Sequence, residues 1–260
     1  MPTSLLDRQV SLLEYLTSSG AIFGDNEIAC LNPALLGIDL GLLRLEACFS
    51  HEKRMEKITA IFPRTFQILG TNRAATVREF VVAYPPTDIS RLENARQFFN
   101  FICNPSRREP LEPPYVCDVA ACELAIAKVR VGAEDRLSDQ ARDEHAPRDG
   151  IRRHPGVILL RCAHNIRPIF EGGSGEAPRH DTLLAIAIPP YAEHPRVFEL
   201  LPPAFDVLAA LNDWTDRFAL SAAPEFSELI CDLAEHGLVE ERKSARRLGV
   251  RVLPAVNAIS

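Results

Sequence analysis

Apolar residues recur every three to four positions through the first half of the chain, which is typical of amphipathic helices. Leu6, Val10 and Leu13 mark the first such segment, and Asp39 is placed to cap the start of a second helix. A third stripe, at 55–69, is bent at Pro63 and ended by Gly70. The same period predicts further helices at 77–84, 92–102 and 116–131. Short connections between these segments predict a helical bundle.

The second half begins with a different pattern. Short apolar runs at 157–160, 182–188 and 197–201 predict strands of a small antiparallel sheet. Helix-sized segments follow Pro202-Pro203, the last of them at 225–236 before Gly237. Strands followed by a compact group of helices are typical of a winged-helix-like module, which binds either DNA or a peptide. The fold class expected is therefore α+β.

The two halves are separated by a charged stretch. Residues 134–149 hold six acidic and three basic residues and few large apolar ones. Such a stretch buries too little apolar surface to offset the entropy lost on ordering. We therefore expect a helical bundle at 1–133, a charged linker at 134–150 and a winged-helix-like domain at 151–260.

Composition and the N-terminal sequence predict a cytoplasmic protein. The chain has 260 residues, 47% of them hydrophobic, and lacks the run of about 18 apolar residues that a membrane span needs. Its N-terminus lacks the charged-then-apolar pattern of a signal peptide. Seven cysteines without regular spacing suit reduced thiols rather than a disulfide framework.

The sequence contains no motif for catalysis or metal binding. Paired Cys/His spacings of zinc sites, a phosphate-binding loop and a nucleophile elbow are all absent. We therefore expect no catalytic residue, no metal ligand and no cofactor in this chain. Glu123 lies on an apolar helix face and needs a partner, for which an arginine of a neighbouring helix is favoured over a catalytic role.

Four segments, in their order along the chain, resemble a known family. They are FPRTFQILG at 62–70, FVVAYPP at 80–86, FFNFI at 98–102 and AACELAIA at 120–127, and HPGVILLR at 154–161 follows them. This order is similar to that of the partner proteins of multinuclear non-heme iron-dependent oxidases, which modify ribosomally made peptides. Within the family, the chain most resembles the partner subunit of 3-thiaglutamate biosynthesis, and next the methanobactin partner.

The resemblance implies a non-catalytic subunit. The iron would be held by a separate TIM-barrel oxidase, with which this chain would form a heterodimer. The chain would present a precursor peptide, and in a 3-thiaglutamate pathway the pair would excise a carbon from a cysteine of that peptide.

The physical mechanism expected for peptide binding is strand addition, in which an extended peptide pairs with an exposed sheet edge. The run at 197–201 is the candidate edge strand, and the helix at 225–236 would form the other wall. Leu229 and Leu233 are expected in the core, and Phe226 and Ile230 beside the groove. The expected peptide-binding residues are Val197, Phe198, Glu199, Leu200, Phe226 and Ile230.

The alternative is a winged-helix transcriptional regulator, with 225–236 as its DNA-recognition helix. That helix contains four acidic residues and no Lys or Arg, whereas recognition helices carry Arg, Lys, Asn or Gln toward base edges. Residues 152–241 hold 7 basic and 14 acidic residues, while the tail at 242–260 holds 5 basic and no acidic ones. Because an acidic module binds phosphates poorly, a peptide is favoured over nucleic acid.

Overall fold

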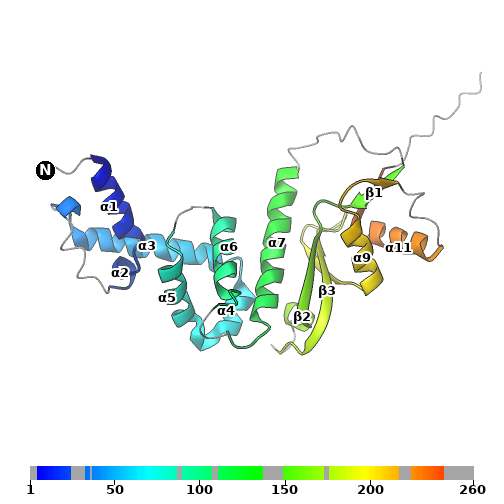
Figure 1. Ribbon diagram of the computed structural model, residues 1–260, viewed down its shortest axis with the longest axis horizontal. Helices are drawn as coiled ribbons and strands as arrows, with labels where there is room; N and C mark the ends of the chain where they lie inside the picture. The colour runs from blue at the N-terminus through cyan, green and yellow to red at the C-terminus, as the bar shows by residue number, and fades with distance from the viewer. Residues whose placement is uncertain are drawn as a thin grey trace, which may run out of the picture.

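The computed structural model describes residues 5–24, 33–35, 37–86, 90–106, 111–136, 149–172, 176–216 and 224–242. The molecule is elongated (Figure 1). The helices of the first half lie at one end, α7 stands in the middle, and the strands with α9 and α11 form the other end. Helices combined with antiparallel strands confirm the α+β class. None of the described helices is long and apolar enough to cross a membrane.

The helical elements follow the chain in order. They are α1 (Leu5–Thr17), α2 (Ser19–Phe23), α3 (Leu40–Thr59), α4 (Pro63–Leu69), α5 (Arg73–Ala83), α6 (Arg91–Ile102), α7 (Val116–Arg136), α8 (Arg167–Phe170), α9 (Pro202–Ala210) and α11 (Pro224–Glu235). Two short 3₁₀ turns, η2 (Pro33–Leu35) and η3 (Gly70–Asn72), lie between them.

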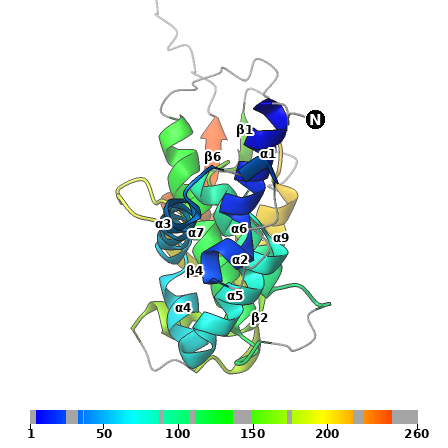
Figure 2. The ribbon, with the colours of Figure 1, turned by 90° about the vertical axis from the view of Figure 1, so that its left-hand side faces the viewer.

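Local sequence sets where these helices begin and end. Asp39 caps α3 by accepting hydrogen bonds from the backbone N–H groups of Gly41 and Leu42, and Ser90 caps α6 in the same way. Pro63 occupies the first turn of α4, where its missing N–H costs no helical hydrogen bond. In Figure 2 α3 is seen nearly end-on, and α1 crosses it at a steep angle.

Aromatic rings fill the first core, which lies among α3 to α7. Phe98 stacks on Phe66 at 5.0 Å between ring centroids and meets Phe80 edge-on at 5.2 Å. The guanidinium of Arg54 lies 4.7 Å from the centre of the Phe80 ring. Its nitrogens donate to three oxygens, which belong to Asn94, Tyr84 and Gln97. Each nitrogen of the buried guanidinium therefore has a hydrogen-bond acceptor.

The strands form two small antiparallel sheets. The strands are β1 (Gly150–Arg153), β2 (Ile158–His164), β3 (Arg179–Ala187), β4 (Arg196–Glu199), β5 (Thr215–Asp216) and β6 (Val239–Arg242). One sheet has the order β2-β3-β4 and the other β5-β1-β6. In the first sheet β3 is central, so β2 and β4 are its edges.

The β2-β3-β4 sheet is covered on both faces. Leu184 and Ile186 of β3 point to one face and pack with residues of α7, among them Val119 and Cys122. Ala185 and Ala187 point to the other face and pack with α9 and α11. This alternation follows from the two-residue period of a strand, and it explains why the run is almost continuously apolar.

Helix α7 contributes to two cores. Val116, Ala120 and Leu124 pack among the helices of the first half. Val119 and Cys122 lie on another side of the same helix and pack against the sheet. The helical and strand-containing parts of the described chain therefore meet through one shared helix.

Three features of the described residues differ from the elements expected from the sequence. Helix α2 lies between the first two helices predicted from the sequence, where no helix was predicted, and Ser18 caps it by accepting a hydrogen bond from the N–H of Ala21. Helix α7 continues to Arg136 and β1 begins at Gly150, so both ends of the expected linker belong to regular elements. The β5-β1-β6 sheet was not expected, and residues 137–148 lie outside the described residues.

Candidate functional site

Strand β4 presents one backbone edge that β3 does not use. The N–H of Leu200 donates to the carbonyl of Leu183 at 2.8 Å, and Phe198 lies opposite Ala185. Because hydrogen-bonded and non-hydrogen-bonded pairs alternate in an antiparallel ladder, the N–H and C=O groups of Val197 and Glu199 point away from β3. In the part of the chain that the structure describes, no strand pairs with β4 on that side.

The side chains of β4 alternate between the two faces of the sheet. Val197 packs with the cluster on the α7 side. Phe198 and Leu200 pack with the cluster that includes α9 and α11. The ring of Phe198 meets that of His236 edge-on, with 5.5 Å between their centroids. The face toward α11 therefore carries the large apolar side chains of the strand.

A groove separates β4 from α11, and we call it the β4–α11 groove. Its volume is about 260 Å³. It is lined by Phe198, Glu199, Leu200, Leu201, Pro203, Ala204, Leu229, Asp232, Leu233, His236 and Leu238. The lining is mainly apolar, with the polar groups of Glu199, Asp232 and His236 among it.

The end of α11 sets the shape of this groove. The N–H of Leu238 donates to the carbonyl of Leu233 at 2.9 Å, and that of Gly237 donates to Ala234 at 3.0 Å. This pair of bonds is a Schellman motif, which requires a residue with positive φ, and Gly237 has φ of 70°. The turn brings Leu238 back beneath the groove. A Cβ at Gly237 would lie 2.7 Å from Cδ of Pro190.

Helix α8 borders β4 near the same edge. Nη1 of Arg167 lies 3.1 Å from Oε2 of Glu199, and its Nε donates to Glu171 at 2.6 Å. Because all three side chains are at least partly exposed, these ion pairs contribute little to stability. Their effect is to offset the charge of Glu199 on the α8 side.

The structure distributes the six expected peptide-binding residues unevenly. Phe198, Glu199 and Leu200 line the groove, whereas Val197 and Phe226 are half-buried and lie outside the set of lining residues. Ile230 is only 3% exposed and packs in the core with Leu233. The expected roles of Ile230 and Leu229 are thus exchanged.

The rotation of α11 about its axis explains this exchange. Leu229, Leu233 and His236 follow the spacing i, i+4, i+7 and together face the groove. Phe226 and Ile230 were expected beside the groove because helical spacing alone does not show which part of a broad apolar helix face is buried most deeply. Asp232 and His236 were not singled out from the sequence. They lie three residues after Leu229 and Leu233, so the same helical spacing could have identified them.

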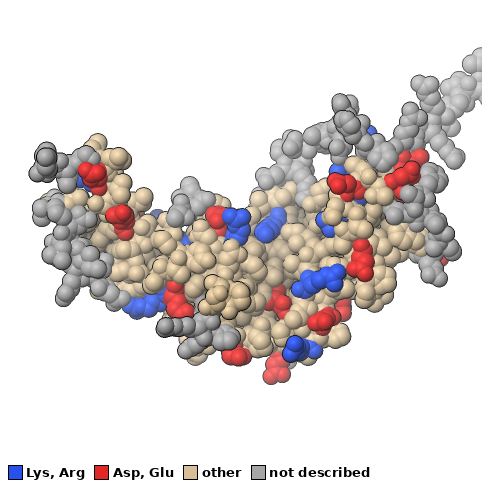
Figure 3. All heavy atoms as spheres, viewed as in Figure 1, with Lys and Arg blue, Asp and Glu red and all other residues tan. Residues whose placement is uncertain are grey.

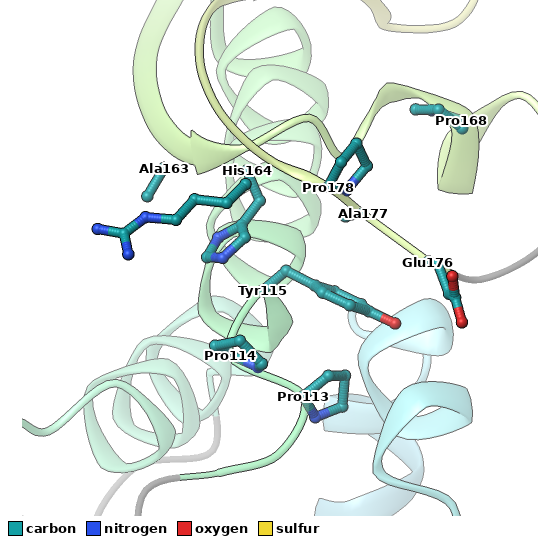
Figure 4. A pocket seen from close by; sticks show the side chains of 10 residues that line it. Pro113, Pro114, Tyr115, Ala163, His164, Pro168, Glu176, Ala177 and Pro178 are labelled. Carbon is teal, nitrogen blue, oxygen red and sulfur yellow. The ribbon is translucent and has the colours of Figure 1, made fainter.

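A second hollow lies where the helical part meets the sheet, and we call it the junction cleft (Figure 4). Its volume is about 990 Å³. It is lined by Pro113, Pro114, Tyr115, Ala163, His164, Pro168, Glu176, Ala177, Pro178 and Arg179. Figure 4 shows proline rings on opposite sides of it and Tyr115 reaching toward Glu176.

One histidine of the junction cleft is held in a fixed orientation. Nδ1 of His164 lies 2.8 Å from Oδ2 of Asp118, which also accepts a hydrogen bond from the His164 backbone N–H at 3.1 Å. The rings of Tyr115 and His164 are 6.1 Å apart. Burial, with a smaller contribution from the charge of Glu176, raises the pKa of Tyr115 above its usual value.

The two hollows differ in what they can do chemically. Among the described residues that line the junction cleft, none is a Ser, Thr or Cys that His164 could activate as a nucleophile. The β4–α11 groove lies beside the open backbone edge of β4, which can accept another strand. Among the described residues, no group of three or more His, Cys, Asp or Glu side chains could hold a metal ion.

Comparisons with known proteins add no further constraint. No protein-family model matches the chain. No curated protein matches it.

Proposed function

We propose that this chain is the non-catalytic partner subunit of a separate iron-dependent oxidase and that it presents an extended precursor peptide to that enzyme. In this proposal residues 151–260 form a winged-helix-like peptide-recognition domain, and residues 1–133 form a helical bundle that supports it. The single observation that carries the proposal is the open edge of β4 beside the β4–α11 groove.

Strand addition follows from the backbone geometry of β4. The outward N–H and C=O groups of Val197 and Glu199 can pair with a peptide in extended form. Alternate side chains of an added strand then point toward α11, where the groove can receive one of them. Pro195 and Pro202 flank the strand and limit its length, as expected for an edge that avoids uncontrolled pairing.

The surface of the first two long helices supports a role as a subunit. Helix α1 has no buried residue, and Leu6 and Leu13 are 67% and 63% exposed. Exposed large apolar residues on α1 and α3 are Leu5, Leu6, Val10, Leu13, Leu42, Leu45 and Phe49. We infer that these residues contribute to the surface that meets the partner, since large exposed apolar patches mark interaction sites.

The chemistry itself is assigned to the partner. The sequence resemblance implies a TIM-barrel oxidase that holds the iron, and a cysteine of the precursor peptide as the group that it modifies. In this division of labour the present chain binds and orients the peptide, and a 3-thiaglutamate-type carbon excision takes place at the partner's iron.

The charge of α11 argues against the DNA-binding alternative. Glu228, Asp232 and Glu235 are exposed on this helix, and its sequence contains no Lys or Arg. On the face shown in Figure 3, acidic and basic side chains are interspersed rather than gathered into a basic patch. Duplex binding depends on such a patch to displace counterions from the phosphates.

Co-expression tests the proposal directly. The tagged chain should be produced together with an iron-dependent TIM-barrel oxidase, sought among the genes that neighbour its own, and the purified material analysed by size-exclusion chromatography with light scattering. The expected result is a complex of equal stoichiometry that binds the precursor peptide of that oxidase. A chain that elutes alone and leaves the oxidase fully active on the peptide would overturn the proposal.

A further inference from the structure

An acidic stripe runs along α11 beside the β4–α11 groove. Glu228, Asp232 and Glu235 follow the spacing i, i+4, i+7, which places them on one side of the helix. All three are exposed. Nδ1 of His236 lies 3.6 Å from Oδ1 of Asp232, and within the described residues none of the three carboxylates pairs with Lys or Arg.

The apolar part of the groove lies next to this stripe. Leu229 and Leu233 of α11 face Phe198 of β4 and Leu200, the residue that follows the strand, across it. A volume of about 260 Å³ has room for one large aliphatic or aromatic side chain. An extended peptide on the edge of β4 would therefore be anchored by a single apolar residue.

The same strand geometry fixes which peptide positions reach the stripe. Residues two apart on an added strand point to the same face, so the neighbours of the anchor on that face are two positions before and after it. A Lys or Arg side chain is long enough to pass along the apolar wall with its stem and to place its charge in water beside the carboxylates. Arg196, the basic residue of β4, is not among the residues that line the groove.

We propose that the β4–α11 groove selects basic extended peptides, in which a large apolar anchor is followed or preceded, two residues away, by Lys or Arg. This inference rests on the proposed peptide-binding function and specifies the chemistry of its ligand. The apolar pocket supplies affinity, and the acidic stripe of Glu228, Asp232 and Glu235 excludes acidic segments.

A random peptide library separates this inference from the function on which it rests. The full-length chain is used to select from phage-displayed nonapeptides, and the enriched sequences are made as fluorescein-labelled peptides for anisotropy measurements. We expect enrichment of Lys or Arg two positions from a large apolar residue. We also expect affinity to fall as salt is raised, because exposed charge pairs are screened.

Two matched triple variants test whether the acidic stripe is responsible for the binding of basic peptides. The triple variant Glu228→Gln, Asp232→Asn, Glu235→Gln should weaken binding of the basic peptides by roughly tenfold, since each exposed pair contributes a fraction of a kcal/mol. The control Glu14→Gln, Glu52→Gln, Glu56→Gln removes the same charge from exposed residues of α1 and α3 and should leave affinity unchanged.

The possible results have distinct meanings. Enriched peptides without basic residues, or basic peptides that bind the triple variant as tightly as the original chain, would overturn the basic specificity and leave peptide binding intact. Equal weakening by the control variant would also overturn it, because the effect would then be one of net charge. The absence of any enriched peptide would count against the proposed peptide-binding function itself.

Discussion

The carboxylate of Glu123 on α7 accepts a hydrogen bond from the hydroxyl of Thr65, with 2.7 Å between Oε2 and Oγ1. It also accepts hydrogen bonds from the backbone N–H groups of Thr65 and Arg64, at 3.0 and 2.7 Å. The first N–H groups of a helix have no partner within it, and here a side chain from another helix satisfies two of them at the start of α4. The partner expected from sequence was an arginine side chain, and the structure shows helix α4's backbone instead.

Replacing this carboxylate should therefore destabilise the protein. Glu123→Ala would leave two buried donors and one partly buried donor without an acceptor, at a cost of about 3 kcal/mol in the free energy of unfolding. Urea unfolding followed by circular dichroism measures this cost. Glu112→Ala, a change at an exposed carboxylate, is the control and should have little effect. Equal stability of the Glu123→Ala variant and the original chain would contradict this account.

The protonation of Glu123 adds a pH dependence. Burial raises its pKa above the usual 4.5, and the accepted hydrogen bonds oppose that shift only in part. The folded state therefore holds the proton more tightly than the unfolded state, so this contribution to stability is present below pH 4.5 and is lost as pH rises through the folded pKa. The Glu123→Gln variant has no such proton. The free energy of unfolding of the original chain minus that of Glu123→Gln should fall with rising pH, whereas a rise would show that the hydrogen bonds outweigh burial.

Arg54 should not tolerate replacement by lysine. Its guanidinium donates to three different oxygens while stacking on Phe80, a geometry that a single ammonium group does not reproduce. Burial lowers the pKa of Arg54 to about 10. We expect Arg54→Lys to cost about 2 kcal/mol, measured by urea unfolding, because buried acceptors lose their donors. Lys53→Arg, a change at an exposed neighbour, provides the matched control.

If a peptide adds to the open edge of β4, its binding should depend on the backbone N–H groups of that strand. The N–H of Val197 points away from β3, so Val197→Pro removes a donor that an added strand would need while the β3–β4 ladder keeps its bonds. Binding of a labelled precursor peptide should fall at least tenfold. Val197→Thr keeps the N–H and should retain most of the affinity. If both variants bind the peptide like the original chain, the peptide binds elsewhere.

The thiols should differ sharply in reactivity. Burial raises the pKa of Cys162 to about 12 and also raises that of Cys122, whereas Cys231 is exposed on α11. Because the thiolate is the reactive form, Cys231 should react first with a chromogenic disulfide reagent. Cys30 lies outside the described residues, so it is first replaced by serine. In that Cys30→Ser background, adding Cys231→Ser should remove the fast phase of the labelling reaction. Rapid labelling of Cys122 or Cys162 in the folded protein would contradict the described packing.

Much of the helical part could be predicted from sequence because its signals are local. Asp39 and Ser90 cap helices, and Gly70 and Gly237 end them, through interactions with residues only a few positions away. The β5-β1-β6 sheet could not be predicted in this way. It joins Gly150 to Asp216 and to Arg242, and strands of two to four residues are too short to carry a recognisable period.

The candidate site shows the same division. The edge position of β4 and its place beside α11 were expected from the order of the elements, and three of the expected residues line the groove. The burial of each side chain on α11 was not expected. Which of the neighbours Leu229 and Ile230 is buried depends on how the helix is rotated about its axis against the sheet. Ile230 packs in one cluster with Leu208 and Leu211, which lie about twenty residues before it in the chain, and such contacts cannot be read from helical spacing.

The sharing of α7 between two cores limits how the chain can be divided. A fragment that ends at Arg136 would carry Val119 and Cys122 into solvent, and one that begins at Gly150 would uncover Leu184 and Ile186. Neither piece would be expected to fold well alone, since each would expose the apolar surface that α7 covers. Because α7 is buried in both cores, a cut in the chain between Arg136 and Gly150 would leave the two parts joined by side-chain packing alone.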